Sequence, residues 1–345
     1  MDPLIRTLIV DDSAFVRKVV KEMLSRSPYI DVVGTARDGQ EALEMVEQLR
    51  PDVVTCDLQM PRLDGVKFVR EQMSRRPLPI LILTASPEDG EATLEAMEAG
   101  AIDFVQKPTA LASAEILVIR DDLVEKVKAA ARASLAHLPQ KAPAAQARSF
   151  FKGRDLKVDL VVIGISTGGP QALRYLIPQF PEDFPVPIAM VLHMPVGYTQ
   201  LFAQKLAEIS RLKVKEAREG DPLAAGTALL AQAGKHMLFR RTGNGQVVTQ
   251  LSMQPLELPH RPAADILFQS AAEVYRSRVL GVVMTGMGND GRQGAAWIKA
   301  QGGTILTEAE ESCVIYGMPR SVVEAGLSDG AVLLGQMAQA IIERL

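Results

Sequence analysis

Short apolar runs alternate with amphipathic segments along the first third of the chain. The runs at residues 4–10, 30–36, 53–56, 80–83 and 102–105 have the length and composition of β-strands. Between them, apolar residues recur at helical spacing, as Ala42, Leu43 and Val46 do. Strands that alternate with helices form a parallel sheet that is covered by helices on both faces. We therefore expect an α/β domain whose last helix lies within residues 114–135.

A second pattern of the same kind begins near residue 156. Its apolar runs predict strands at residues 158–163, 188–192, 280–284 and 304–307. Gly243-Asn244-Gly245 is a turn sequence typical of an antiparallel hairpin, which we expect as an insertion in a mostly parallel, doubly wound sheet. Residues 136–149 are largely Ala, Pro, Gln and basic residues, and they predict a linker. The pattern thus predicts two α/β domains, at residues 1–130 and 156–345, joined by a linker at residues 131–155.

Composition and charge narrow the classes of function. A chain of 345 residues that is 47% hydrophobic and 23% charged is long enough for two globular cores. With a net charge of −3 and no dense run of Lys and Arg, nucleic acid is not an expected partner. No window approaches the ~18 apolar residues of a membrane helix, and the N-terminus lacks a signal-peptide pattern, so we expect a cytoplasmic protein without membrane insertion. Cys56 and Cys313 lie in different predicted domains and are expected to be reduced thiols.

Polar residues follow four of the five strands predicted in the first domain. Asp11 and Asp12 follow the first strand, Asp57 the third, Thr84 the fourth and Lys107 the fifth. Because the carboxyl ends of parallel strands line one edge of a sheet, we expect these side chains to converge. Three carboxylates in one cleft repel each other unless a cation compensates, and Mg²⁺ takes oxygen ligands of this kind. The cluster predicts a site where Asp57 receives a phosphoryl group that Lys107 and Thr84 contact, although any one acid alone could simply cap a helix or start a turn.

A serine flanked by glycines follows the first strand of the second domain. Ser166 lies in Gly164-Ile165-Ser166-Thr167-Gly168, directly after the apolar run. Glycines permit a tight strand-to-helix turn, which presents the hydroxyl at the sheet edge beside the free N–H groups of the next helix. This pattern is typical of a serine nucleophile, but any tight turn between a strand and a helix would also fit it.

A serine hydroxyl needs a base within hydrogen-bonding reach and an acid that orients the base. His193 follows the strand at residues 188–192 and should therefore lie at the same sheet edge as Ser166. His260, between two prolines, is the second candidate, and either histidine could instead be a structural residue in a loop. We favour His193 for its place after a strand. Asp290 follows the strand at residues 280–284 and is the candidate for the orienting acid.

The loop that holds Asp290 has a competing interpretation. It reads Gly286-x-Gly288-x-x-Gly291, and Glu308 follows at the end of the next strand. Strand, glycine turn, helix and acid together match the fingerprint of a dinucleotide-binding site. However, such a turn usually begins its own domain, whereas this one falls late in the second domain. A third interpretation is purely structural, with tight glycine turns and Asp290 as a helix cap. A phosphate-binding P-loop motif does not occur in the sequence.

The first ~125 residues resemble a response-regulator receiver domain. The resemblance is carried by Asp11-Asp12-Ser13, Asp57-Leu58-Gln59-Met60-Pro61, Asp64-Gly65, Thr84-Ala85-Ser86 and Asp103-Phe104-Val105-Gln106-Lys107-Pro108. It implies a flavodoxin-like fold and phosphorylation of Asp57 by a histidine kinase. It also implies that Mg²⁺ is bound by Asp11 or Asp12 together with Asp57 and the Gln59 carbonyl, and that Phe104 is the aromatic residue that rotates on activation. Lys107-Pro108 is a candidate cis peptide.

Residues 156–345 resemble the catalytic domain of the chemotaxis protein-glutamate methylesterases. The resemblance is carried by Gly164-Ile165-Ser166-Thr167-Gly168-Gly169, His193-Met194-Pro195, His260-Arg261-Pro262, Met284-Thr285-Gly286-Met287-Gly288-Asn289-Asp290-Gly291 and Tyr316-Gly317-Met318-Pro319. It implies that Ser166 is the nucleophile, His193 the base, Asp290 the orienting acid and the Met287 backbone N–H an oxyanion donor.

The family also implies a substrate and a mode of control. The substrates would be glutamyl methyl esters and glutamines of methyl-accepting chemoreceptors, hydrolysed without a cofactor for the esterase reaction. Phosphorylation of Asp57 would relieve coverage of the serine cleft by the receiver domain. Two alternatives from other classes are a receiver-controlled binding protein without catalysis, which the presence of Ser166, His193 and Asp290 disfavours, and a dinucleotide binder.

Overall fold

The chain forms two compact units, Met1–Ala136 and His137–Leu345, each built on its own parallel sheet. The computed structural model describes residues 4–85, 89–107, 115–135, 151 and 155–345. The predicted linker segment at residues 136–149 lies outside the described residues, as does Pro108 of the predicted cis peptide. Within the described part of the chain, no helix is both long and apolar enough to cross a membrane.

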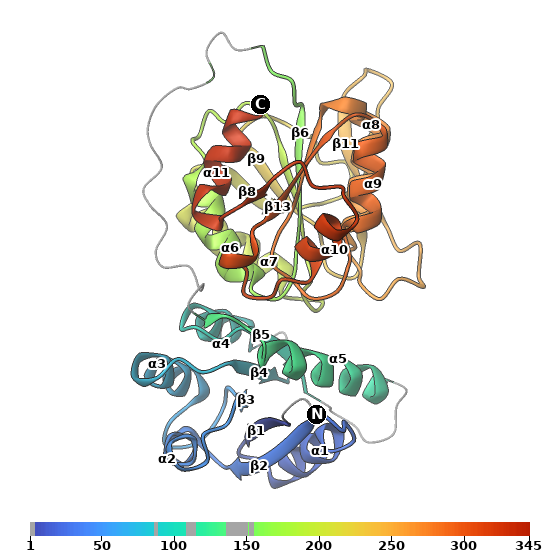
Figure 1. Cartoon of the computed structure of the whole chain (residues 1–345). Coiled ribbons are helices and arrows are strands. Elements are labelled where there is room, and N and C mark those ends of the chain that lie inside the picture. Colours follow the sequence, from blue (N-terminus) through green and yellow to red (C-terminus); the bar gives the residue numbers. More distant parts are fainter. Residues whose placement is uncertain (1–3, 86–88, 108–114, 136–150, 152–154) are drawn as a thin grey trace. The chain divides into compact units, whose positions relative to one another are not determined.

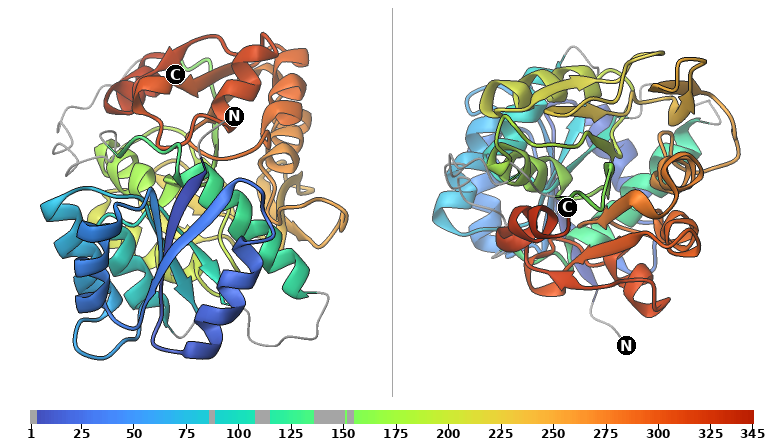
Figure 2. Two further views of the ribbon diagram at one scale, coloured as in Figure 1. Left: turned by 60° about the horizontal axis from the view of Figure 1, so that its bottom comes forward. Right: turned by 90° about the horizontal axis from the view of Figure 1, so that it is seen from above.

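The first unit is a five-stranded parallel sheet in the order β2-β1-β3-β4-β5, as the alternating pattern predicted. Its strands are β1 (Ile5–Val10), β2 (Ile30–Ala36), β3 (Val53–Asp57), β4 (Ile80–Thr84) and β5 (Asp103–Gln106). Its helices are α1 (Ala14–Leu24), α2 (Gly39–Leu49), α3 (Gly65–Arg75), α4 (Gly90–Glu98) and α5 (Glu115–Ala130). Helices α1 and α5 pack together on one face, while α2, α3 and α4 cover the other (Figures 1 and 2).

Burial of both faces explains the continuous apolar strands of this unit. Every residue of β3 and β4 is buried, because helices cover the sheet on each side. The chain turns in opposite directions after β1 and β3, which are neighbours in the sheet. A crevice forms where the strand order reverses, and the loops that follow β1 and β3 meet there.

The second unit is a seven-stranded parallel sheet in the order β14-β13-β12-β6-β7-β9-β8. Its strands are β6 (Leu160–Ile165), β7 (Ile188–Leu192), β8 (Lys213–Glu216), β9 (Thr227–Leu230), β12 (Val279–Val283), β13 (Thr304–Glu308) and β14 (Ala331–Val332). The predicted antiparallel hairpin is also present, as β10 (His236–Arg241) and β11 (Val247–Ser252), but it forms a separate two-stranded sheet that packs on α8. The prediction of a mostly parallel α/β unit with a hairpin is confirmed.

Helices cover both faces of this larger sheet. They are α6 (Gly169–Leu176), α7 (Thr199–Ile209), α8 (Ala264–Tyr275), α9 (Arg292–Ala300), α10 (Met318–Glu324) and α11 (Leu334–Glu343). Helices α8, α9 and α10 lie on one side, and α6, α7 and α11 lie on the other (Figure 1). The core between α8 and the sheet includes Phe268, which is fully buried.

The strand order of the second unit reverses around β6. From β6 the chain moves outward through β7, whereas from β12 it moves the other way to β13. Strand β6 therefore lies between β7 and β12, and the loops after these three strands emerge side by side at one sheet edge. Ligand sites of open α/β sheets lie at such reversals.

Candidate active site and phosphorylation site

Ser166 is the first residue after β6, in a tight turn that leads into α6. Its backbone N–H donates to the Thr285 carbonyl oxygen at 3.0 Å, and its own carbonyl accepts from the Gly169 N–H at 2.6 Å. Gly168 has a φ of 79°, a left-handed conformation that glycine adopts without strain. Ser166 is half-buried at the sheet edge. The turn that the glycines predicted is therefore present.

His193 follows β7 directly and lies beside this turn. Its backbone N–H donates to the Ile165 carbonyl at 3.2 Å, which ties it to the end of β6. Its ring Nε2 lies 2.8 Å from Oδ2 of Asp290. Its Nδ1 is buried and has no hydrogen-bond partner within the described residues. Because an ionised carboxylate can only accept, Nε2 carries the proton and Nδ1 of the neutral ring is the nitrogen that can take one.

Asp290 is held in its ionised form at the N-terminus of α8. Its carboxylate accepts from the backbone N–H groups of Ala264 at 2.7 Å and of Asp265 and Gly291 at 2.9 Å. Burial raises the pKa of Asp290, but the hydrogen bonds from His193 and from the Asp265 and Ala264 N–H groups outweigh it and bring the pKa to about 2. Asp290 is therefore a carboxylate at neutral pH, with His193 Nε2 at hydrogen-bonding distance.

The second candidate histidine lies against the first. The rings of His193 and His260 are stacked, with centroids 4.1 Å apart and planes 16° from parallel. The hydrogen bond to Asp290 belongs to His193. The structure thus brings both histidines to one place and gives them different contacts.

The glycine loop after β12 packs directly on the serine turn. Gly286 accepts from the N–H groups of Gly317 and Met318 at 3.1 and 2.8 Å, and a Cβ at Gly286 would lie 2.8 Å from the Ser166 Cβ. The next residue, Met287, is half-buried, and its N–H donates to no other residue in the part of the chain that the structure describes. The loop that carries Met287 therefore lies against the Ser166 turn.

Glu308 does not occupy the position that a dinucleotide site requires. It ends β13 with no exposed surface, and its carboxylate accepts from the Thr285 N–H at 2.9 Å and from the Ser312 hydroxyl at 3.1 Å. An acid with these contacts cannot reach the ribose hydroxyls of a ligand. The dinucleotide interpretation is therefore wrong in its acidic residue, since the fold buries the side chain that the fingerprint needs at the surface.

The acidic cluster of the first unit lies at the crevice beside β1 and β3. Single oxygens of Asp11, Asp12 and Asp57 all lie within 4.8 Å of one another. Lys107 reaches into the cluster, with its Nζ 2.9 Å from Asp11 Oδ2 and 2.7 Å from Asp57 Oδ1. Burial raises the pKa of Asp57, and Asp11 adds to this effect, while Lys107 opposes it. Asp11 and Asp57 are buried, and Asp12 is exposed.

These residues fit a hard divalent cation. The donor set consists of carboxylate oxygens, which Mg²⁺ and Ca²⁺ prefer, and one ammonium group leaves the three acids with a negative surplus. The exposed Asp12 gives the cluster an open side. A cation at this place would relieve the repulsion between Asp11 and Asp57 that Lys107 balances only in part.

The remaining predicted residues lie on β4, on β5 and in the loop after β3. Thr84 is buried at the end of β4, and its carbonyl accepts from the Lys107 N–H at 2.7 Å. Gln59 donates its backbone N–H to Asp57 Oδ1 at 3.3 Å. Phe104 is buried on β5, and its carbonyl accepts from Lys126, a residue of α5 that no sequence motif marks. The structure therefore gathers the predicted polar residues at one edge.

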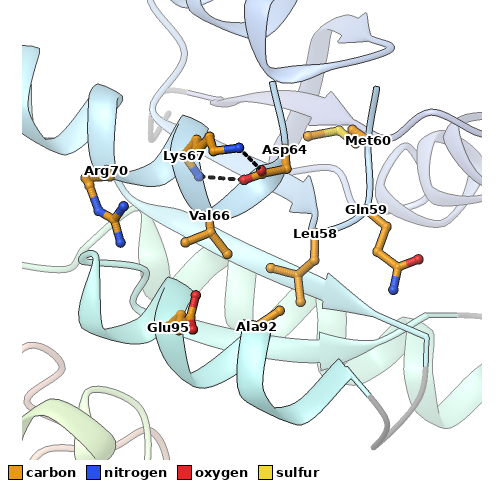
Figure 3. A pocket seen from close by; sticks show the side chains of 9 residues that line it. All are labelled: Leu58, Gln59, Met60, Asp64, Val66, Lys67, Arg70, Ala92 and Glu95. Atoms are coloured by element: carbon orange, nitrogen blue, oxygen red, sulfur yellow. Dashed lines mark hydrogen bonds and ion pairs between the residues drawn. The ribbon is translucent and has the colours of Figure 1, made fainter. Parts of the chain in front are cut away.

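A cavity of about 570 Å³ opens next to the acidic cluster, between α3 and α4 (Figure 3). It is lined by Leu58, Gln59, Met60, Asp64, Val66, Lys67, Arg70, Ala92 and Glu95. An ion pair at 2.8 Å joins Asp64 and Lys67 at its rim. None of the three clustered acids lines it, so the cavity borders the loop after Asp57 and is separate from the acidic cluster.

Fold and site together define a class of protein, in which a receiver unit is joined to an α/β unit with a serine, histidine and aspartate at one sheet edge. The CheB methylesterase family matches residues 161–341, and the response regulator receiver domain matches residues 7–118. The chain belongs to the CheB methylesterase family and carries a receiver domain.

Individual relatives agree with this assignment. Protein-glutamate methylesterase/protein-glutamine glutaminase 5 of Myxococcus xanthus is 46% identical over 97% of this chain and 96% of its own length. A protein of the same name, without the numeral, from Pyrococcus abyssi is 40% identical over 98% of this chain and 93% of its own. The crystal structure of the Thermotoga maritima CheB methylesterase catalytic domain matches with a TM-score of 0.53 and 40% identity, over 55% of this chain and 99% of that one.

We expect Gly286→Ala to disturb the serine turn more than it disturbs the fold. The new Cβ would lie 2.5 Å from the Met318 sulfur, which can move, and 2.8 Å from the Ser166 Cβ, which cannot move without shifting the turn. Labelling of Ser166 by a fluorophosphonate should slow by about tenfold or more. Gly243→Ala is the matched control, because a Cβ there meets nothing within 4 Å. Wild-type labelling by a folded Gly286→Ala variant would contradict this expectation.

We expect Glu308 to make the second unit less stable as pH rises. Burial, opposed by hydrogen bonds from Thr285 and Ser312, raises the pKa of Glu308 from 4.5 to about 7. Between these values the folded unit binds more protons than the unfolded one, so the free energy of unfolding falls with rising pH, by about 3 kcal/mol in total. Above pH 7 the loss is complete, and below pH 4.5 it is absent.

Glu308→Gln tests this pH dependence. It removes the titration, so the variant should match the wild type near pH 5 and exceed it in stability above pH 7. The chain has one tryptophan, Trp297 in α9, whose fluorescence follows unfolding of the second unit in urea. Stability curves for the two proteins that run parallel from pH 5 to pH 8 would rule out the raised pKa.

Proposed function

We propose that this chain hydrolyses glutamyl methyl esters of chemoreceptors and deamidates their glutamines, under control of phosphorylation at Asp57. The observation that carries the proposal is the Ser166 turn packed beside a His193–Asp290 pair whose nitrogen and oxygen are 2.8 Å apart. The names of relatives that match along nearly the whole chain support the reaction and the substrate. The work would be divided between residues 1–130, which receive the phosphoryl group, and residues 156–345, which carry out hydrolysis, with residues 131–155 as linker.

In the proposed reaction, Nδ1 of His193 takes the proton of Ser166 as the hydroxyl oxygen attacks the ester carbonyl carbon. The Met287 N–H donates to the oxyanion that develops, a contribution on the order of 3 kcal/mol for one such donor. His193 returns the proton to the leaving oxygen, and methanol departs. Water, deprotonated by His193, then attacks the acyl carbon, and His193 returns that proton to the Ser166 oxygen as glutamate is released. For a glutamine the same steps expel ammonia.

Asp290 contributes by orientation. Its carboxylate accepts from His193 Nε2 and stabilises the imidazolium that forms when Nδ1 is protonated. Because three backbone N–H groups hold the carboxylate, it is ionised before substrate arrives. The charge therefore needs no rearrangement during the reaction.

At the receiver site, we assign Asp57 as the residue that a histidine kinase phosphorylates. Asp11 or Asp12, Asp57 and the Gln59 carbonyl would hold Mg²⁺, which when bound neutralises charge on the phosphoryl group. Lys107 pairs with Asp57 at 2.7 Å and would instead contact a phosphoryl oxygen, together with the Thr84 hydroxyl. Loss of that pairing is the local change that would reach Phe104 on the neighbouring β5 and shift the receiver between two states.

Ser166→Ala and His193→Ala should each reduce methanol release from methylated receptor by about 10⁴-fold or more, because each removes a group that the reaction needs. His260→Ala is the matched comparison. It removes the ring stacked on His193 and keeps the His193–Asp290 hydrogen bond, so it should cost less than about tenfold. If Ser166→Ala keeps full methanol release, the chain is not a serine esterase, and a binding role without catalysis would replace the proposal. If His260→Ala is the more damaging histidine variant, the assignment of the base is wrong.

Phosphorylation should raise methanol release. Acetyl phosphate with Mg²⁺ should accelerate the wild type and leave Asp57→Asn unchanged, and EDTA should abolish the acceleration. Residues 150–345 alone should be faster than the unphosphorylated full chain, because the proposed coverage of the cleft is gone. Equal rates for the fragment and the full chain would eliminate that coverage as the means of control.

A further inference from the structure

Glu308 is a buried acid for which the reaction above has no use. Its side chain has no exposed surface, and none of the ion pairs among the described residues includes it. The groups that face it are the Thr285 N–H, the Ser312 hydroxyl and the Cys313 thiol, so no charged side chain compensates it. Burying a carboxyl group without a charged partner lowers the free energy of unfolding unless its hydrogen bonds compensate. The hydrogen bonds of Glu308 therefore indicate what the group does.

Thr285 connects Glu308 to the serine turn through all its polar groups. Its N–H donates to Glu308 Oε2 at 2.9 Å, and its carbonyl accepts from the Ser166 N–H at 3.0 Å. Its hydroxyl donates to the Thr167 carbonyl at 3.0 Å and accepts from the Ile315 N–H at 3.0 Å. Thr285 is itself buried. Thr285 therefore links the Glu308 carboxyl group to two backbone groups of the serine turn, the Ser166 N–H and the Thr167 carbonyl.

The other carboxyl oxygen of Glu308 is anchored to a separate element. Ser312 donates to Glu308 Oε1 at 3.1 Å, and the Leu334 N–H at the start of α11 donates to the Ser312 hydroxyl at 2.9 Å. A continuous hydrogen-bonded path thus runs from α11 through Ser312, Glu308 and Thr285 to Ser166. Since every step is buried or half-buried, water does not readily replace a missing partner.

We propose that Glu308 is a positioning residue for the Ser166 nucleophile, acting through Thr285. This inference rests on the proposed esterase function. Glu308 touches neither substrate nor reacting atoms. It satisfies the buried Thr285 N–H and so fixes the peptide whose carbonyl holds the Ser166 N–H. Without an acceptor, that N–H would be left unpaired in the core, and the segment would shift to find one.

The role needs a hydrogen-bonding pattern and does not need a negative charge. Burial raises the pKa of Glu308 to about 7, so the neutral carboxyl is substantially populated at neutral pH. A neutral carboxyl accepts from Thr285 with one oxygen and donates to the Ser312 hydroxyl with the other. A glutamine side chain offers the same acceptor and donor in nearly the same shape. Glutamine should therefore replace Glu308, whereas alanine should not.

The test uses the full-length chain with two matched pairs of variants. Glu308→Ala and Glu308→Gln differ in whether Thr285 keeps its acceptor. Thr285→Val and Thr285→Ser differ in whether the hydroxyl between Thr167 and Ile315 is kept. Arg278→Ala controls for general destabilisation, because it breaks an ion pair with Asp159. These two residues directly precede β12 and β6, at the sheet edge opposite to Ser166. Each variant is assayed for fluorophosphonate labelling of Ser166, for kcat and KM of methanol release, and for Trp297 fluorescence as a check of folding.

We expect Glu308→Ala and Thr285→Val to slow labelling and to lower kcat by about ten- to a hundredfold, with KM unchanged, because substrate binding does not involve the path. Glu308→Gln and Thr285→Ser should stay within about twofold of the wild type, as should Arg278→Ala despite its lower stability. If Glu308 had a purely structural role, Glu308→Ala would lower stability but leave kcat of the folded fraction unchanged.

Two results would overturn the inference. One is wild-type kcat in folded Glu308→Ala. The other, decisive if that variant does not fold, is a loss of about tenfold or more in kcat of folded Glu308→Gln, which keeps the acceptor for the Thr285 N–H. Failure of the proposed function would look different, since the wild type would then resist labelling or would be labelled at a residue other than Ser166.

Discussion

The placement of β6 between β7 and β12 is the constraint on which the catalytic edge depends. Parallel pairing of β6 with both neighbours fixes the heights at which the three strands end. The Ser166 turn, His193 and the loop that carries Asp290 then emerge together, although Ser166 and Asp290 are far apart in sequence. Backbone hydrogen bonds from Ser166 to Thr285 and from His193 to Ile165 extend this pairing one residue beyond the strands. The pairing of the backbone therefore places these residues at one sheet edge, independently of contacts between their side chains.

Both units use the same physical arrangement for different chemistry. In each, acids gather where the strand order of a parallel sheet reverses, and the surroundings decide their protonation. Asp290 receives three backbone N–H groups and a histidine, which lower its pKa despite burial. Asp57 has a buried acidic neighbour, and its pKa rises even with Lys107 beside it. The first environment favours a permanent orienting charge, while the second favours a site that gains from a bound cation.

In the second unit, hydrophobic patterning predicted the central strands well and the peripheral ones poorly. Strand Ile188–Leu192 has the predicted bounds, because continuous burial leaves an unbroken apolar run. Strands β8, β9 and β14 were not predicted. Lys213–Glu216 lies at the edge of the sheet and is largely polar, Thr227–Leu230 has only four residues, and Ala331–Val332 has two residues. Their pairing is decided by neighbours far away in sequence.

The sequence by itself determined the two α/β units and the residues that end their strands, since hydrophobic periodicity and turn residues are local properties. It also marked Ser166, His193, Asp290 and the acidic cluster as candidates. Only the tertiary structure decided among competing roles. In the structure, His193 makes the hydrogen bond to Asp290, and the ring of His260 stacks on His193. Glu308, which the glycine pattern would place at a ligand, is fully buried. The burial of a side chain and its hydrogen-bond partners depend on which distant segments pack together, and local sequence patterns do not predict that packing.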